Sequence, residues 1–172
     1  MPIMVRRGRF CGGPDPGADS GGMSGIEIGE ATAEERLWCA RLMASSEPWI
    51  TLRRGEDACR AASVDPDYVV LIARMRGAPL GFARLHPRGV AGSPYLASIA
   101  VEASARSRGV GAALLEAGEK RFAGARWMFL CVSSFNARAR ALYERHGYRV
   151  ACDLPDYVID GASETLMLKR LA

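Results

Sequence analysis

The chain has 172 residues, 49% of them hydrophobic, and a formal net charge of +4. These values favour one globular domain with a sizeable core, and no apolar run is long enough to cross a bilayer. The small positive charge is almost all arginine and no basic run with interleaved aromatic residues occurs, so neither nucleic acid nor a membrane is an expected partner. Five widely spaced cysteines with no CxxC pair argue against a disulfide framework or a zinc site. We therefore expect a cytoplasmic protein with reduced, mostly buried thiols and no bound metal.

Residues 1–22, MPIMVRRGRFCGGPDPGADSGG, differ in composition from the rest of the chain. They are rich in glycine and proline and show no periodicity, and the apolar stretch before Arg6 is too short for a signal peptide. We expect a flexible tail or a non-native extension here, followed by a single domain over residues 23–172.

From Ile26 onwards, strand-like and helix-like patterns alternate. A strand over 26–28 precedes a helix over 33–44, for which Thr32 is the expected N-cap. The later expected elements are a helix at 55–62, strands at 68–75, 80–86 and 95–101, a helix at 110–122, a strand at 126–132, a helix at 137–146, and strands at 148–154 and 164–169, with a Pro/Gly-rich loop before residue 95. This order predicts a three-layer α/β fold with a mixed sheet, with neighbouring parallel strands around helix 110–122.

The segment RSRGVG, residues 106–111, joins an expected strand to an expected helix. A helix N-terminus presents unpaired N–H groups and favours an anion. Gly109 and Gly111 remove side chains that would keep a phosphate away from those amides, and Arg106 and Arg108 add positive charge. A tight strand-to-helix turn is the alternative interpretation of this segment.

Two common nucleotide-binding motifs are absent from the sequence. The P-loop motif GxxxxGK[ST] does not occur, and no third glycine completes the dinucleotide-binding motif GxGxxG. Their absence disfavours a dinucleotide-binding oxidoreductase.

A second segment, FNARARALYERHGY, begins at Phe135. Asn136 occupies an N-cap position, and Tyr143 follows seven residues later, which places both within roughly 20° on one helix face. A polar amide and a phenol on one face favour a helix that borders a cleft, although a satisfied cap and an exposed tyrosine would fit the same pattern.

Together the two segments resemble the GNAT superfamily of acyl-CoA-dependent N-acyltransferases, with some similarity to ribosomal-protein alanine N-acetyltransferases. The resemblance covers about residues 25–170 and rests on R-x-x-G-x-G at 106–111 and on N-x-x-A-x-x-[LF]-Y-x-x-x-G-[FY] at 136–148. It implies a mostly antiparallel mixed sheet of six to seven strands, helices on both faces, and a splayed central parallel pair. It also implies transfer of an acetyl group from acetyl-CoA to a primary amine. A non-catalytic acyl-CoA-binding or regulatory module on the same fold is the alternative, and a homodimer is possible.

The resemblance also implies roles for individual positions. The pyrophosphate would lie on the loop and the first helical turn, and the pantetheine arm would pair with the preceding strand. An N–H near Ile99 would hold the oxyanion, Asn136 would bond the arm, and Tyr143 would protonate the leaving thiolate. The implied cofactor-binding residues are Ile99, Val101, Arg106, Arg108, Gly109, Val110, Gly111, Ala112 and Asn136.

The general base and the acceptor stay open at the level of sequence. Alanine N-acetyltransferases often carry a glutamate where this chain has Cys131, so Glu47, His86, Glu102 and a water relay are all candidates. The acceptor pocket is expected between 46–52, which includes Trp49, and the loop 153–164. That loop holds Tyr157 as a possible wall and four acidic residues that would attract a cationic acceptor: Asp153, Asp156, Asp160 and Glu164. A peptide or protein N-terminus, a small polyamine or amino acid, and an antibiotic amine all remain possible acceptors.

Overall fold

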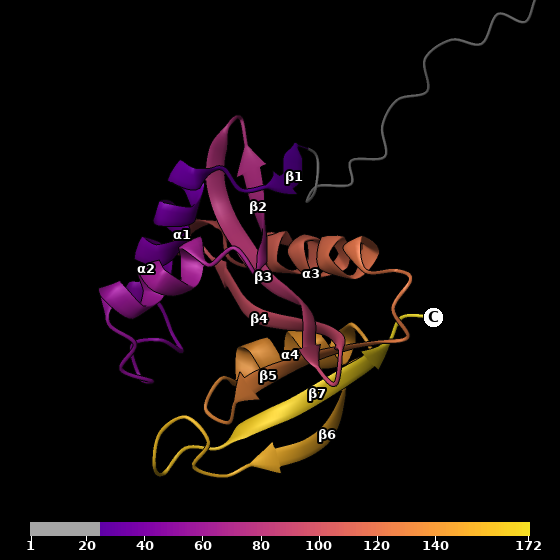
Figure 1. Cartoon of the computed structure of the whole chain (residues 1–172). Helices are drawn as coiled ribbons and strands as arrows, with labels where there is room; N and C mark the ends of the chain where they lie inside the picture. Colours follow the sequence, from indigo (N-terminus) through magenta and orange to yellow (C-terminus); the bar gives the residue numbers. More distant parts are fainter. Residues whose placement is uncertain (1–24) are drawn as a thin grey trace, which may run out of the picture.

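The computed structural model describes residues 25–172, so the expected tail at 1–22 lies outside the described residues. One seven-stranded sheet has the order β1-β2-β3-β4-β5-β7-β6 (Figure 1). The strands are β1 (Ile26–Glu30), β2 (Val69–Met75), β3 (Ala78–Val90), β4 (Ser93–Val101), β5 (Trp127–Ser133), β6 (Arg149–Leu154) and β7 (Glu164–Arg170). The helices are α1 (Ala33–Ala44), α2 (Glu56–Val64), a short 3-10 turn η1 (Ala103–Ala105), α3 (Val110–Arg121) and α4 (Ala137–Arg145).

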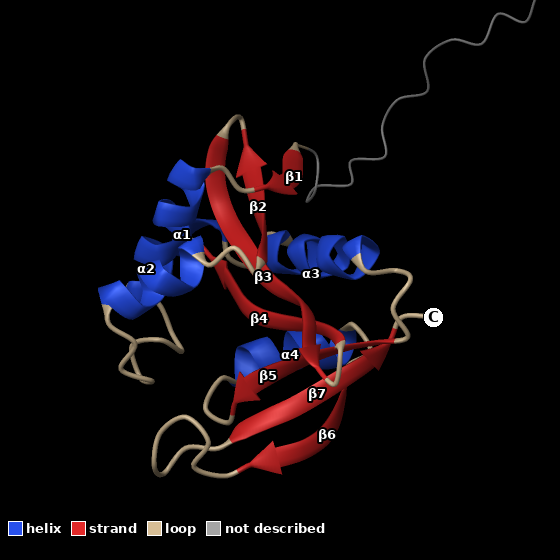
Figure 2. Cartoon of the chain, viewed as in Figure 1, coloured by secondary structure: helices blue, strands red, loops and turns tan. Residues whose placement is uncertain are grey.

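The helices cover both faces of the sheet, as the sequence predicts (Figure 2). On one face, α1 and α2 pack against the sheet around Met43, Ile72 and Phe82. On the other face, α3 and α4 enclose a larger cluster that includes Leu114 and Leu130. The three-layer α/β/α prediction is therefore confirmed. No helix within residues 25–172 is long and apolar enough to span a membrane.

The parallel pair at the centre of the sheet is short and then splays. β4 and β5 share only two residue pairs, Tyr95 with Phe129 and Leu96 with Leu130. Every other neighbouring pair in the sheet is antiparallel. Past Leu96 the two strands separate toward their carboxyl ends, and this separation leaves backbone groups of both strands without a strand partner.

Two expectations about the chain need correction. The Pro/Gly-rich stretch before residue 95 is not a loop, because β3 continues to Val90 and forms a hairpin with β4 in which Val90 faces Ser93. The cysteines are less buried than expected: of the four within residues 25–172, all free, Cys39 and Cys59 are buried, Cys131 is half-buried and Cys152 is exposed. Cys11 lies outside the described residues.

Side-chain caps explain why the starts of α1 and α4 agree with the sequence-based prediction. Thr32 accepts from the Glu35 N–H while Glu35 accepts from the Thr32 N–H, a complete capping box. Asn136 Oδ1 accepts from the Ala139 N–H at 3.2 Å. Gly147, just past α4, has φ 86°, the left-handed conformation that commonly ends a helix at glycine.

Candidate active site

A groove of about 490 Å³ runs between the end of β4, the following loop and the helices α3 and α4. Its lining includes most of the predicted cofactor-binding positions. These are Ile99, Val101, Arg106, Gly109, Val110, Gly111, Ala112 and Asn136. Arg108 is exposed and does not line the groove. The structure thus brings the two sequence motifs, 25 or more residues apart in the chain, to opposite walls of one groove.

The glycine loop ends in an unpaired helix N-terminus. Gly109 is the N-cap of α3, with φ 80° and no side-chain cap, a left-handed conformation that costs an L-residue roughly 1–2 kcal/mol. The first intrahelical bond found is from the Ala113 N–H to the Gly109 carbonyl. The N–H groups of Val110, Gly111 and Ala112 consequently have no partner within the helix and border the groove, an arrangement that suits an anion.

Arginines from both walls add positive charge to the groove. Arg106 donates from Nε to the Val101 carbonyl at 3.1 Å, which ties the loop to the end of β4. Arg138 on α4 donates to Ser107 Oγ at 3.1 Å across the groove. Arg138 and Arg145 both line it, and sequence reasoning missed them, although their spacing of seven residues places them on the same helix face.

The splayed end of β4 presents backbone donors to the gap. The Glu102 N–H donates to the Leu80 carbonyl on the β3 side at 2.8 Å, and Ala100 faces Phe82 in the same register. Because successive N–H groups of a strand point to opposite sides, those of Ile99 and Val101 point away from β3, toward the gap. Ala97 forms a β-bulge in β4, because it lies between the Arg84–Ser98 and Leu85–Leu96 pairs of the β3–β4 register. The bulge is at the position where β4 separates from β5.

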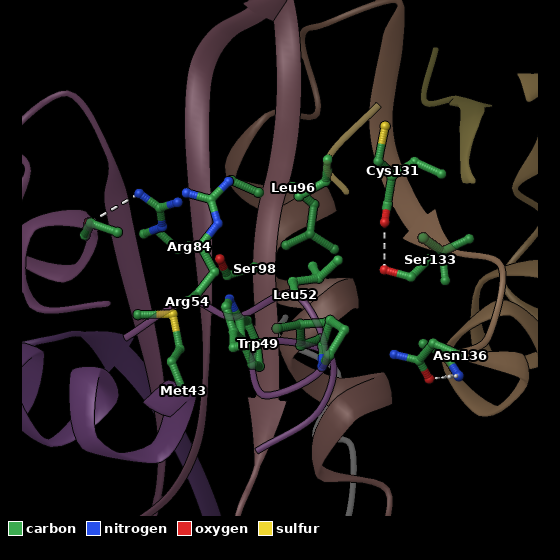
Figure 3. Close-up of a pocket in the computed structure, with 18 of the residues that line it drawn as sticks. Met43, Trp49, Leu52, Arg54, Arg84, Leu96, Ser98, Cys131, Ser133 and Asn136 are labelled. Atoms are coloured by element: carbon green, nitrogen blue, oxygen red, sulfur yellow. Dashed lines mark hydrogen bonds between the residues drawn. The ribbon is translucent and has the colours of Figure 1, made fainter. Parts of the chain in front are cut away.

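A second pocket, of about 420 Å³, occupies the gap between β4 and β5 and extends toward α2 (Figure 3). Trp49 and Leu52 line one side of it, as expected for the segment 46–52. Three residues line both this pocket and the groove: Ile99, Asn136 and Ala139. The two cavities therefore meet at the point where the β4 backbone faces the N-terminus of α4.

Tyr143 also lines the second pocket, with only 4% of its surface exposed. The alternative of an exposed tyrosine is thereby wrong. Its ring packs edge-on to Tyr148 at 6.0 Å between centroids, and burial raises the pKa of its phenol above the ordinary value. Because Tyr143 lines the pocket, its phenol is the candidate proton donor to a ligand bound there.

Glu164 provides the only carboxylate among the described residues that line the second pocket, and no histidine lines it. Glu164 begins β7, faces Ser133 of β5 in the register, and accepts a bond from Ser133 Oγ at 2.5 Å. It is only 6% exposed, and this burial raises the pKa of its carboxyl, an effect that the Ser133 bond opposes. The sequence prediction that Glu164 faces the acceptor pocket agrees with its place in the lining, but sequence reasoning did not include Glu164 among the candidate bases.

The other acids of the loop 153–164 do not line the pocket. Asp153 accepts from Thr165 Oγ1 at 2.7 Å, and Asp156 accepts from the Gly161 N–H at 2.7 Å within the loop itself. Of the four acids that the sequence predicts to face an acceptor, only Glu164 therefore lines the pocket. Tyr157, 67% exposed, does line the pocket, together with Val158.

None of the three base candidates from the sequence lines this second pocket. Glu47 is exposed, lines the groove instead, and accepts from the Thr51 N–H at 3.2 Å. His86 packs edge-on against Tyr68, and its Nδ1 accepts from the Arg88 N–H. Glu102 precedes the η1 turn and lines neither cavity.

Gly111 offers a test of the groove that is separate from folding. A Cβ at this position would meet only ordinary contacts, with Leu142 at 3.5 Å and Val101 at 3.7 Å. Gly111→Ala is therefore expected to leave the melting temperature unchanged or raise it, since alanine favours a helix by up to about 1 kcal/mol over glycine. The added methyl lies in the groove, so we expect the affinity of the groove for a phosphate-bearing ligand to fall several-fold. Gly109→Ala, at φ 80°, is the contrasting variant and should lose stability; unchanged affinity for such a ligand in Gly111→Ala would contradict this account.

Comparison with known proteins identifies the family to which this chain belongs. Residues 31–148 match the family model described as the acetyltransferase (GNAT) family, and the chain belongs to that family. It is 37% identical over 82 residues to an uncharacterized N-acetyltransferase of Methanocaldococcus jannaschii, a match that covers 46% of this chain and 53% of that protein. The matched part therefore spans about half the length of that relative.

Solved structures share the fold across most of the chain. The ribosomal-protein-S18-alanine N-acetyltransferase from Escherichia coli has a TM-score of 0.68 and 24% identity, covering 86% of this chain and 94% of that one. An aminoglycoside 6'-N-acetyltransferase complexed with coenzyme A has a TM-score of 0.71 and 18% identity, covering 85% and 97%. Arabidopsis thaliana NAA60 in complex with a bisubstrate analogue has a TM-score of 0.71 and 18% identity, covering 86% and 99%. At these identities the likeness shows the fold.

Proposed function

We propose that the protein transfers an acetyl group from acetyl-CoA to a primary amine by direct attack within a ternary complex. The observation that carries this proposal is the meeting of two cavities at Ile99, Asn136 and Ala139. One cavity is a cationic groove with an unpaired helix N-terminus, and the other is a pocket that contains a buried acid and a buried phenol. A donor and an acceptor bound in the two cavities would bring their reacting atoms together at the junction.

The groove accounts for recognition of the acetyl-CoA substrate. Its pyrophosphate would accept bonds from the N–H groups of Val110, Gly111 and Ala112, with Arg106 and Arg138 beside it. The pantetheine arm would lie along the free edge of β4 and pair with Ile99 and Val101. The Asn136 amide oxygen is engaged by its own helix, so its NH2 group is the part that would bond the arm.

The chemical step forms a C–N bond and breaks the thioester C–S bond. The neutral amine nitrogen attacks the acetyl carbonyl carbon. The oxyanion that develops accepts a hydrogen bond from the Ile99 N–H. This N–H points into the gap because β4 and β5 separate there. Tyr143 then protonates the departing thiolate. Burial, which raises its pKa, keeps this phenol in the protonated form that a general acid requires.

Glu164 takes the role of general base in this proposal. It lines the acceptor pocket, is buried, and is bonded to Ser133. A raised pKa makes its carboxylate a stronger base than an ordinary glutamate, and a proton from the attacking nitrogen would pass to it directly or through one water. Glu164 is preferred over Glu47, His86 and Glu102 because none of those three lines the pocket.

The test is acetyl-CoA-dependent thiol release with a panel of amines at pH 7 and pH 8.5. The panel contains short peptides with free N-termini, amino acids, polyamines and aminoglycosides. We expect release with one class of amine, retained at pH 7. If acetyl-CoA raises the melting temperature while no amine supports release, the non-catalytic acyl-CoA-binding module replaces the enzyme. If acetyl-CoA produces no shift, the assignment of the groove is wrong.

A further inference from the structure

Two arginines line the acceptor pocket on the side of α2, across from Ser133 and Asn136 (Figure 3). Arg84 of β3 donates from Nη1 to the Ala62 carbonyl at 2.9 Å, and its guanidinium carbon lies 3.9 Å from the centre of the Tyr68 ring. Its Nε is buried and has no hydrogen-bonding partner. Arg54 is exposed and lines the same pocket.

Arg84 also forms no ion pair with a carboxylate among residues 25–172, although the charge of Asp65 acts on it from a greater distance. Four ion pairs are found within residues 25–172, and none of them includes Arg84 or Arg54. Burial lowers the pKa of the Arg84 guanidinium, but an arginine side chain stays protonated in proteins. A half-buried guanidinium without a carboxylate is costly to the protein alone, and an anion brought by a ligand would remove that cost.

We propose that the acceptor carries a carboxylate in addition to its amine, and that Arg84 binds this carboxylate, with Arg54 at the pocket mouth. The proposal rests on the proposed function, because it names the acceptor class of the same site. The planar guanidinium suits a carboxylate, which it can bond through two N–H groups. The amine end would lie toward Glu164 and the junction with the groove.

The dimensions of the pocket fit a small amino acid of this kind. Its volume of about 420 Å³ is in the range of small-molecule sites. Arg84 faces Ser98 in the β3–β4 register, one residue before Ile99, where the amine must attack. One molecule that lies across the pocket could therefore carry the carboxylate at the Arg84 end and the amine at the Ile99 end.

The same charges disfavour polycationic acceptors. The charged residues that line the pocket are Arg54, Arg84 and Glu164, two positive and one negative. A polyamine or an aminoglycoside would bring several further positive charges next to the two guanidinium groups. This reasoning reverses the sequence-based expectation of an acidic pocket for a cationic amine.

Binding of matched pairs to the full chain saturated with CoA, which has no acetyl group to transfer, tests the proposal. The pairs are glycine with methylamine, β-alanine with ethylamine, and 4-aminobutanoate with propylamine, each measured by calorimetry. We expect at least one amino acid to bind about tenfold to hundredfold more tightly than its partner, the range of a hydrogen bond to a charged group. Arg84→Gln should abolish the difference, Arg84→Lys should restore part of it, and Arg60→Gln, an exposed residue on α2 outside both cavities, should leave it unchanged.

The proposal is overturned if no amino acid binds more tightly than its matched amine, or if Arg84→Gln leaves the preference intact while CoA still stabilises the variant against heat. Failure of the proposed function has a different signature. In that case the amino acid would bind in an Arg84-dependent manner, yet no thiol would be released from acetyl-CoA.

Discussion

Replacing Tyr143 with phenylalanine is expected to lower kcat by about 10²- to 10⁴-fold, the usual contribution of a positioned general acid. The ring is buried and packs against Tyr148, and phenylalanine keeps that ring. The melting temperature and the affinity for acetyl-CoA should therefore stay close to those of the unchanged protein. The measurements are steady-state thiol release, thermal unfolding, and calorimetric binding of CoA.

Tyr148→Phe is the matched control for this variant. Tyr148 is also buried, its hydroxyl has no hydrogen-bonding partner, and it lines neither cavity. The Tyr148→Phe variant lacks a hydroxyl group but should keep the kcat for thiol release. If Tyr143→Phe retains full kcat, or if both variants lose activity equally, Tyr143 is not the proton donor.

The sequence predicted best those parts of the fold that depend on neighbouring residues. Thr32 and Asn136 cap their helices through bonds to residues three positions away, so the signal for each helix start lies within a few letters. The seven-residue spacing from Asn136 to Tyr143 likewise placed both on one helix face bordering a cleft. The sequence also predicted one residue set on each wall of the groove: Gly109 and Gly111 at the start of α3, and Asn136 at the start of α4.

The chemistry of the acceptor pocket could not be predicted in this way, because it depends on register between distant strands. Glu164 reaches the site only because β7 pairs with β5 so that it faces Ser133, 31 residues away. In the sequence it is one acid among several in a loop. Arg84 similarly enters the pocket through the β3–β4 register and the bulge at Ala97. The hydrophobic pattern of β3 shows a strand, but it does not show which cavity a polar side chain on that strand will line.

Glu164→Gln is expected to separate activity from stability. Glutamine retains an oxygen that can accept the Ser133 bond, but it cannot take a proton from the attacking amine. We expect kcat/KM for the preferred amine to fall by about 10²- to 10⁴-fold at pH 7. Glu116→Gln, an exposed position on α3 outside both cavities, is the control and should have no effect.

The pH profile tests the role of Glu164 more sharply than the rate at one pH. The base is active only when deprotonated, and burial raises its pKa above the ordinary value, about 4.3 for glutamate. The acid limb of kcat/KM should therefore lie at higher pH than an ordinary glutamate would give. In Glu164→Gln that limb should vanish and leave only the titration of the amine itself. A variant that keeps the limb at the same pH would show that another group is the base.

Stability should change in the opposite sense to activity. A carboxyl whose pKa is higher in the folded chain than in the unfolded chain contributes stability at pH values below its unfolded pKa, and this contribution is lost as the pH rises through the folded pKa. At pH 7 the unchanged protein therefore holds a charge in a buried position, and Glu164→Gln removes that charge. We expect the variant to melt at the same or a higher temperature than the unchanged protein at pH 7, and to lose this advantage toward pH 4. A variant that melts at a lower temperature at pH 7 would indicate that Glu164 serves mainly to hold β7 against β5.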